Sequence, residues 1–194
     1  EIISNIVEGG NIILNEDDKF FNYLSKEAIK KKINVTSFSV YKKNADIFLL
    51  QNRKIKNYYR LKVVVKKRIF NFDIKYPTHN FINNILACIS VLFVLNLDLN
   101  IMKKKFSGFF IPDGRGDIKI VKKFKKKFKL IDESYNANPL SMMSAINNMN
   151  YYNGNQNHRK LVFLGDMLEL GKKSKKLHRE LSIIINKSDI DKVF

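Results

Sequence analysis

The pattern of apolar and polar residues in the first 40 positions predicts a parallel α/β unit. A short apolar run at 12–14 indicates a buried strand, which ends in the polar residues NEDD at 15–18. Residues 20–32 place apolar side chains at helical spacing, and residues 35–40 are rich in β-branched residues. The order strand, helix, strand is typical of parallel sheets.

The pattern changes after residue 48. Alternating apolar runs over 48–74 predict an antiparallel meander, which Pro77 ends. Residues 80–95 then predict a helix of about four turns, and the connector at 98–110 contains a second amphipathic segment.

The segment IPDGRGD at 111–117 is the best candidate for a domain boundary, because proline and two glycines interrupt regular structure there. Beyond it we expect two strands within 118–131 around a lysine-rich turn, a helix over 139–149 and a buried strand at 161–164. A helix over 175–186 and the start of a strand at 191–194 follow. The second half therefore predicts another α/β unit, and we expect both ends of the chain to continue into a longer protein.

Net charge, cysteine content and one apolar run add three constraints. The formal net charge is +18, which is typical either of a polyanion-binding protein or of a lysine-rich composition spread over any protein. Cys88 is the single cysteine, so a disulfide framework is excluded, and its apolar surroundings predict a small buried side chain. The apolar run at 85–97 is shorter than the roughly 20 residues that span a bilayer, so we expect a buried helix and no membrane insertion.

The first candidate site is the segment THNFINNILA at 78–87. His79 and Asn80 fall at a predicted helix start, where free backbone N–H groups favour anions, and Asn83 follows one turn later. A carboxamide offers a donor and an acceptor, which suits the edge of adenine. The alternative is that an asparagine at this place only caps the helix.

Two further segments surround the predicted hairpin. The motif GRG at 114–116 places Arg115 in a glycine-rich loop, where its guanidinium could contact phosphate or only solvent. The segment IDESYNANP at 131–139 follows a predicted strand, and open α/β sheets bind ligands at the carboxyl ends of strands. The alternative is a capped connection between strand and helix, with Asn138 as the cap. The polar residues of the segment exceed what a cap requires; they are Asp132, Glu133, Tyr135, Asn136 and Asn138.

The third segment, LGDMLELG at 164–171, also follows a predicted strand. Asp166 and Glu169 could bind a cation or orient a substrate amine, and His178 follows on a predicted helix. The alternatives are a tight glycine-bounded loop and a structural histidine.

In this order and at this spacing, the motifs HNxxNxxxA, GRG, DESYNANPxSM and VFLGDMLELG with a downstream histidine resemble the Mur ligases, and in particular their MurF branch. The segment EGGNIILNEDD at 8–18 is similar to the one that follows the family's catalytic lysine. The resemblance implies that residues 1–111 are the later part of a P-loop-type central ATP-binding domain. Residues 112–194 would be the first part of a Rossmann-like C-terminal domain.

The resemblance also implies an activity: ATP-dependent joining of D-Ala-D-Ala to UDP-N-acetylmuramoyl tripeptide through an acyl phosphate, with ATP and Mg²⁺ required. His79, Asn80, Asn83, Arg115 and Glu133 would bind ATP. Tyr135, Asn136 and Asn138 would lie on the substrate side, and Asp166, Glu169 and His178 would line the cleft. No catalytic residue and no metal ligand are expected within these residues.

Two departures from the family pattern are visible. Glu133 stands where many relatives carry aspartate, and Pro77 and Thr78 stand where a glycine often precedes the HN pair. Other Mur ligases and the folylpolyglutamate ligases remain alternatives, as does a basic nucleic-acid-binding module, although its aromatic and helix-turn-helix signatures are missing. We expect a cytoplasmic monomer that binds no nucleic acid.

Overall fold

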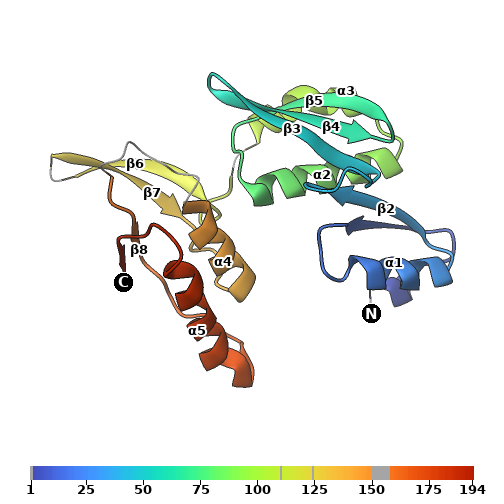
Figure 1. Cartoon of the computed structure of the whole chain (residues 1–194). Helices are drawn as coiled ribbons and strands as arrows, with labels where there is room; N and C mark the ends of the chain where they lie inside the picture. The colour runs from blue at the N-terminus through green and yellow to red at the C-terminus, as the bar shows by residue number, and fades with distance from the viewer. Residues whose placement is uncertain (1, 110, 124, 150–157) are drawn as a thin grey trace. The chain divides into compact units, whose positions relative to one another are not determined.

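The computed structural model describes residues 2–109, 111–123, 125–149 and 158–194. The chain forms two compact units, Glu1–Phe109 and Phe110–Phe194, which are described separately below. Both contain helices and strands, so the predicted α/β class is confirmed (Figure 1).

The first unit is built on one five-stranded sheet with the order β1-β2-β3-β4-β5. β1 and β2 are parallel and are joined through α1, as the sequence pattern predicted, and β2 pairs with the beginning of β3 in parallel as well. β3, β4 and β5 form the predicted antiparallel meander. The elements of this unit are η1 (Ile3–Asn5), β1 (Asn11–Asn15), α1 (Phe21–Lys30), β2 (Asn34–Ser39), β3 (Ile47–Ile55), β4 (Tyr58–Val65), β5 (Arg68–Ile74), α2 (His79–Val94), α3 (Leu99–Lys105) and η2 (Phe106–Gly108).

The core of the first unit lies between this sheet and α2, α3 and η2 (Figure 1). One stripe of α2 is buried because its apolar residues recur at helical spacing, namely Ile82, Ile85, Leu86 and Ile89. Phe72 of β5 and Phe106 of η2 meet edge to face in the same core, with ring centroids 5.4 Å apart.

Two expectations about α2 are wrong in detail. Cys88 is exposed, because its position on the helix falls outside the buried stripe, although neighbouring side chains still desolvate the thiol and raise its pKa. The apolar run at 85–97 is only partly buried, since the helix ends at Val94 and both Leu95 and Leu97 are more than half exposed. Throughout the residues that the structure describes, no helix combines the length and apolar character needed to cross a membrane.

The second unit begins with the predicted hairpin, β6 (Asp117–Lys123) and β7 (Lys126–Asp132), in an antiparallel pair. α4 (Pro139–Asn148) follows, then β8 (Leu161–Val162), η4 (Gly171–Lys173), α5 (Ser174–Ile185) and β9 (Lys192–Val193). β8 and β9 are parallel, with α5 between them in the sequence, so this part is again a strand–helix–strand unit. A small core between α4 and α5 buries Ile146, Met167 and Leu181.

The strand expected to be buried at 161–164 is shorter and more exposed than predicted. β8 has two residues, and Leu161 and Phe163 are 44% and 75% exposed. Within the described residues β8 pairs only with β9, and the apolar faces of α4 and α5 pack against each other. An apolar run predicts burial only where a neighbouring layer covers it.

Candidate functional site

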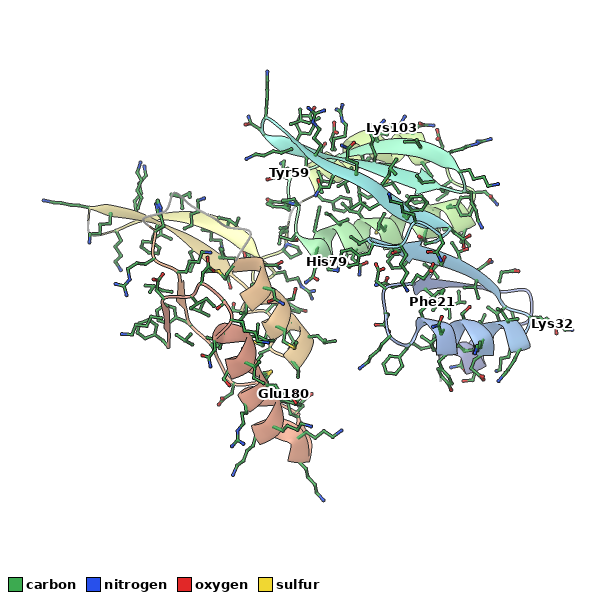
Figure 2. All side chains as sticks on the ribbon, viewed as in Figure 1. Phe21, Lys32, Tyr59, His79, Lys103 and Glu180 are labelled. Atoms are coloured by element: carbon green, nitrogen blue, oxygen red, sulfur yellow. The ribbon has the colours of Figure 1, made fainter. Side chains whose placement is uncertain are left out.

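The first cluster of predicted site residues lies at the start of α2. Thr78 is the N-cap, and its hydroxyl accepts a hydrogen bond from the backbone N–H of Phe81 at 3.4 Å. His79, labelled in Figure 2, is the first helical residue. Asn80 is the second. Since Thr78 caps the helix, neither Asn80 nor Asn83 is needed for that purpose.

Two residues at or just beyond the ends of β1 and β2 complete this cluster, and the sequence did not identify either of them. Tyr41, just beyond β2, stacks on the His79 ring with centroids 5.3 Å apart, and its hydroxyl lies 3.3 Å from His79 Nδ1. Asn15, the last residue of β1, donates from Nδ2 to Oδ1 of Asn83 at 3.4 Å. Flat rings and carboxamides therefore meet where the carboxyl ends of two parallel strands approach a helix N-terminus.

The polar loop after β1 is held firmly beside this cluster. Asp17 accepts hydrogen bonds from the Ser39 hydroxyl at 2.6 Å and from the Val40 N–H at 2.7 Å. Glu16 is buried and accepts from the Asn44 amide at 2.7 Å. These bonds fix the backbone on both sides of Tyr41, so the aromatic ring is held where it meets His79.

A second cluster lies entirely in the second unit, where the GRG loop packs on the segment that follows β7. Gly116 N–H donates to the Asp132 carbonyl at 2.7 Å, and Tyr135 N–H donates to the Gly114 carbonyl at 3.0 Å. Both glycines have positive φ, 74° for Gly114 and 91° for Gly116. A Cβ atom would lie 2.9 Å from Tyr135 N at the first position and 2.9 Å from Glu133 Oε1 at the second. At Gly114 a side chain would meet backbone atoms, so the close approach requires glycine there; at Gly116 the left-handed φ favours glycine, since the Glu133 side chain could move.

This packing brings together three of the predicted site residues, namely Arg115, Glu133 and Tyr135. The Arg115 guanidinium lies over the Tyr135 ring, 3.9 Å from its centroid, within the range of a cation–π contact. Burial raises the pKa of the Glu133 carboxyl, and the charges of Asp132 and Asp117 raise it further. Hydrogen bonds from Ser134 lower the pKa of Asp132. A new hydrogen-bond donor would therefore stabilise the charged form of Glu133 more than that of Asp132, which already accepts hydrogen bonds from Ser134.

The residues predicted for the substrate side differ in their surroundings. Asn138 is the N-cap of α4: its Oδ1 accepts from Ser141 N–H at 2.9 Å, and the Ser141 hydroxyl accepts from Asn138 N–H at 3.0 Å. Asn138 is thus the cap of α4. Asn136 is exposed in the loop before the helix.

The third group surrounds the LGDMLELG loop. His178 Nε2 accepts a hydrogen bond from Met167 N–H at 3.1 Å, and His178 Nδ1 lies 2.9 Å from the Ser174 carbonyl. Because Nε2 accepts from the Met167 N–H, Nδ1 is the nitrogen that can donate to the Ser174 carbonyl. Asp166 is exposed, with Oδ1 3.8 Å from His178 Nε2, and Glu169 is exposed with a left-handed φ of 60°. The structure therefore brings Asp166 and His178 together, while Glu169 is an exposed residue of the same loop.

The three groups divide between the units: His79, Asn80 and Asn83 belong to the first, and all the other predicted residues to the second. Among the described residues, no group of three or more His, Cys, Asp or Glu side chains is arranged to hold a metal ion.

Comparison with known proteins agrees with these features. Residues 1–92 match the family described as the Mur ligase middle domain. A UDP-N-acetylmuramoyl-tripeptide–D-alanyl-D-alanine ligase from Buchnera aphidicola subsp. Baizongia pistaciae is 29% identical over 194 residues, which is 100% of this chain and 40% of that protein. The chain thus spans about two fifths of this relative's length.

Solved structures show the same fold across both units. MurF from Acinetobacter baumannii matches with a TM-score of 0.81 at 22% identity, over 99% of this chain and 40% of that one. MurF from Thermotoga maritima, solved in complex with ADP, matches with a TM-score of 0.72 at 24% identity, over 96% and 40% of the two chains. The fold is that of the Mur ligases. The resemblance to their MurF branch, predicted from the motifs, is confirmed.

Proposed function

We propose that these residues form part of an ATP-dependent ligase of the MurF type, which joins D-Ala-D-Ala to UDP-N-acetylmuramoyl tripeptide in peptidoglycan precursor synthesis. The observation that carries the proposal is the similarity to a ligase of that name along all 194 residues. Residues 1–111 would belong to its central ATP-binding domain and residues 112–194 to its C-terminal domain. The enzyme would work in the cytoplasm as a monomer and bind no nucleic acid.

The proposed reaction has two steps. A carboxylate oxygen of the tripeptide attacks the γ-phosphorus of ATP, so an acyl phosphate forms and ADP leaves. The amine of D-Ala-D-Ala then attacks the acyl carbon, inorganic phosphate leaves, and the nitrogen loses a proton. Mg²⁺ would neutralise phosphate charge during the first step.

The cluster at the start of α2 supports an adenine-binding role. A purine offers a flat π face and an edge of donors and acceptors, and this cluster offers the stacked rings of Tyr41 and His79 beside the carboxamides of Asn15 and Asn83. In the second unit, Glu133 would accept a hydrogen bond from a ribose hydroxyl, and Arg115 would contact the phosphates. Tyr135 would hold the guanidinium ready by stacking against it.

Replacing Asn83 by alanine in the complete enzyme is expected to raise the KM for ATP about threefold to tenfold, with the KM for the tripeptide nearly unchanged. The reason is the loss of one hydrogen bond to adenine, worth about 0.5–1.5 kcal/mol. Steady-state kinetics with each substrate varied in turn will measure this. The matched control is Asn84→Ala, since Asn84 is the next residue of α2 and is exposed. An ATP KM that is equal in the two variants would remove Asn83 from the site.

Replacing Arg115 by lysine is expected to reduce kcat at least about tenfold, because lysine keeps the charge but loses the planar fork and most of the stacking on Tyr135. If Arg115 acts during phosphoryl transfer, kcat falls more than substrate binding does. Arg159→Lys is the control, since Arg159 is an exposed arginine of the same unit. Full activity of the Arg115 variant would show that the side chain has only a surface role.

The test of the proposal as a whole is a ligation assay with the complete protein. ADP release that requires ATP, UDP-N-acetylmuramoyl tripeptide and D-Ala-D-Ala together is the expected result. A panel of single amino acids and glutamate-accepting folates in place of these substrates distinguishes other Mur ligases and folylpolyglutamate ligases. Tight binding to nucleic acid at physiological salt, with no ligation, would instead favour the basic-module alternative.

A further inference from the structure

Two consecutive hydrogen bonds connect the polar loop after β1 to α2. The backbone N–H of Asp17 donates to Oδ1 of Asn15 at 3.0 Å, and Nδ2 of Asn15 donates to Oδ1 of Asn83 at 3.4 Å. Asn15 is the last residue of β1, Asn83 lies one turn into α2, and both side chains are half-buried. Through Asn15, the loop therefore reaches the residue proposed above to contact adenine.

The backbone sets the direction of both bonds. A carboxamide can turn by half a rotation, so that its oxygen and its nitrogen exchange places, whereas a backbone N–H can only donate. Because the Asp17 N–H occupies the oxygen of Asn15, that side chain presents its nitrogen to α2. The nitrogen in turn selects the oxygen of Asn83. Two amides that could each take two orientations are therefore held in one.

The residue at which this chain of bonds begins is itself fixed. The Asp17 carboxylate accepts hydrogen bonds from the Ser39 hydroxyl at 2.6 Å and from the Val40 N–H at 2.7 Å. Ser39 is the last residue of β2 and Val40 follows it, so Asp17 is attached to the neighbouring parallel strand. The Asp17 N–H therefore keeps its direction, and the two amides need little ordering when a ligand binds.

This orientation determines what Asn83 offers to a base. Since Asn15 holds its oxygen, the amide nitrogen of Asn83 is left to donate to a ligand. The ring nitrogens N1 and N7 of adenine are acceptors. A donor matches either of them, whereas an amide oxygen in the same place would be repelled by their lone pairs.

We propose that Asn15 is a positioning residue for base recognition: it holds the carboxamide of Asn83 so that the nitrogen of Asn83 donates to a ring nitrogen of adenine. Asn15 acts through Asn83, and this role rests on the proposed function, under which the cluster at the start of α2 binds adenine.

Two substitutions of Asn15 separate this role from a structural one. Asn15→Asp keeps an oxygen for the Asp17 N–H, but at neutral pH its second oxygen can only accept, so Asn83 turns its nitrogen to it and its oxygen to the base. Asn15→Ala removes both bonds and leaves Asn83 free to take either orientation. A structural role predicts that alanine is the more damaging change, because aspartate preserves the bond from Asp17. The positioning role predicts the reverse order.

The test compares ATP with two analogues in which C–H replaces one ring nitrogen, namely 7-deaza-ATP and 1-deaza-ATP. Calorimetric titration of the complete enzyme at neutral pH, without the tripeptide, measures the three dissociation constants. We expect ATP to bind about threefold to tenfold more tightly than the analogue that lacks the acceptor for Asn83. The analogue that loses affinity also shows which edge of the base faces Asn83.

The variants assign this preference to the orientation of Asn83. In Asn15→Asp the preference should disappear or reverse, because an amide oxygen tolerates a C–H group better than a lone pair. Asn15→Ala should lower it by no more than about twofold, since about half of the Asn83 amides still take the productive orientation. Asn83→Asp, which has no donor, should reproduce the Asn15→Asp pattern. Asn11→Asp is the matched control: it adds the same charge at the first, exposed residue of β1 and should keep the full preference.

Three results would overturn the role of Asn15: equal binding of ATP and both analogues by the unmodified enzyme, a preference that survives in either aspartate variant of Asn15 or Asn83, or a greater loss of preference in Asn15→Ala than in Asn15→Asp. Loss of preference in Asn11→Asp would also overturn it, because added charge alone would then explain the effect.

The ligation assay separates this role from the proposed function. If the complete enzyme ligates D-Ala-D-Ala but its Asn15→Asp variant keeps the preference for ATP, only the role of Asn15 is refuted. If the preferences change as expected but no ligation occurs, only the proposed reaction is refuted.

Discussion

Replacing Phe72 by alanine is expected to lower the free energy of unfolding of the first unit by about 3–5 kcal/mol. Phe72 is fully buried, pairs across the ladder with the fully buried Leu61, and meets the Phe106 ring edge to face. Alanine would remove the ring and leave a cavity between the sheet and η2. The surrounding side chains belong to three different elements and so can collapse only in part.

Hydrogen exchange measured along the chain will test this prediction, because it reports the two units separately. Protection should fall in β4 and β5 and stay unchanged in α4 and α5. Ile69→Ala is the control on the same strand: Ile69 is 58% exposed, so its truncation should cost no more than about 0.5 kcal/mol. If Phe72→Ala lowers the free energy of unfolding no more than Ile69→Ala does, the core around Phe72 does not stabilise the unit.

The 194-residue chain by itself is expected to release no ADP. Phosphoryl transfer requires a backbone cradle and a lysine for the ATP phosphates, which a P-loop supplies as GxxxxGK[ST] or a close variant. The sequence has eight glycines, and none is followed by Lys-Ser or Lys-Thr. Gly171 comes nearest, but Lys172 and Lys173 follow it, at the end of the LGDMLELG loop.

The measurement is ADP release by the purified chain with ATP, magnesium, UDP-N-acetylmuramoyl tripeptide and D-Ala-D-Ala. Reactions without protein and with the complete enzyme are the two controls. Nucleotide binding by the chain is compatible with this prediction, since the residues proposed for adenine and ribose are present. Substrate-dependent ADP release above the no-protein control would contradict the assignment of these residues to a part without the phosphate-binding loop.

Local sequence determined most of the secondary structure. The strand–helix–strand order before residue 40, the meander and the hairpin around residue 125 follow from apolar periodicity and from the positions of glycine and proline. The motifs also identified the segments that carry the candidate site. These segments place polar residues directly after strands, where open α/β sheets bind ligands. Burial was less certain: Cys88 and Leu161 lie in apolar runs but are exposed, because burial depends on which neighbouring element covers a position.

Only the tertiary structure decided which side chains meet. Tyr41 and His79 are 38 positions apart and Asn15 and Asn83 are 68 apart, so their pairing depends on how β1, β2 and α2 pack. The stacking of Arg115 on Tyr135 depends on two glycines that let a loop approach a strand end. The sequence showed His178 as a lone histidine on a helix, whereas in the fold its Nε2 holds a loop eleven residues away and its Nδ1 contacts the Ser174 carbonyl of the same helix. Local propensity acts over a few residues, whereas these contacts arise from the packing of elements that are distant in the chain.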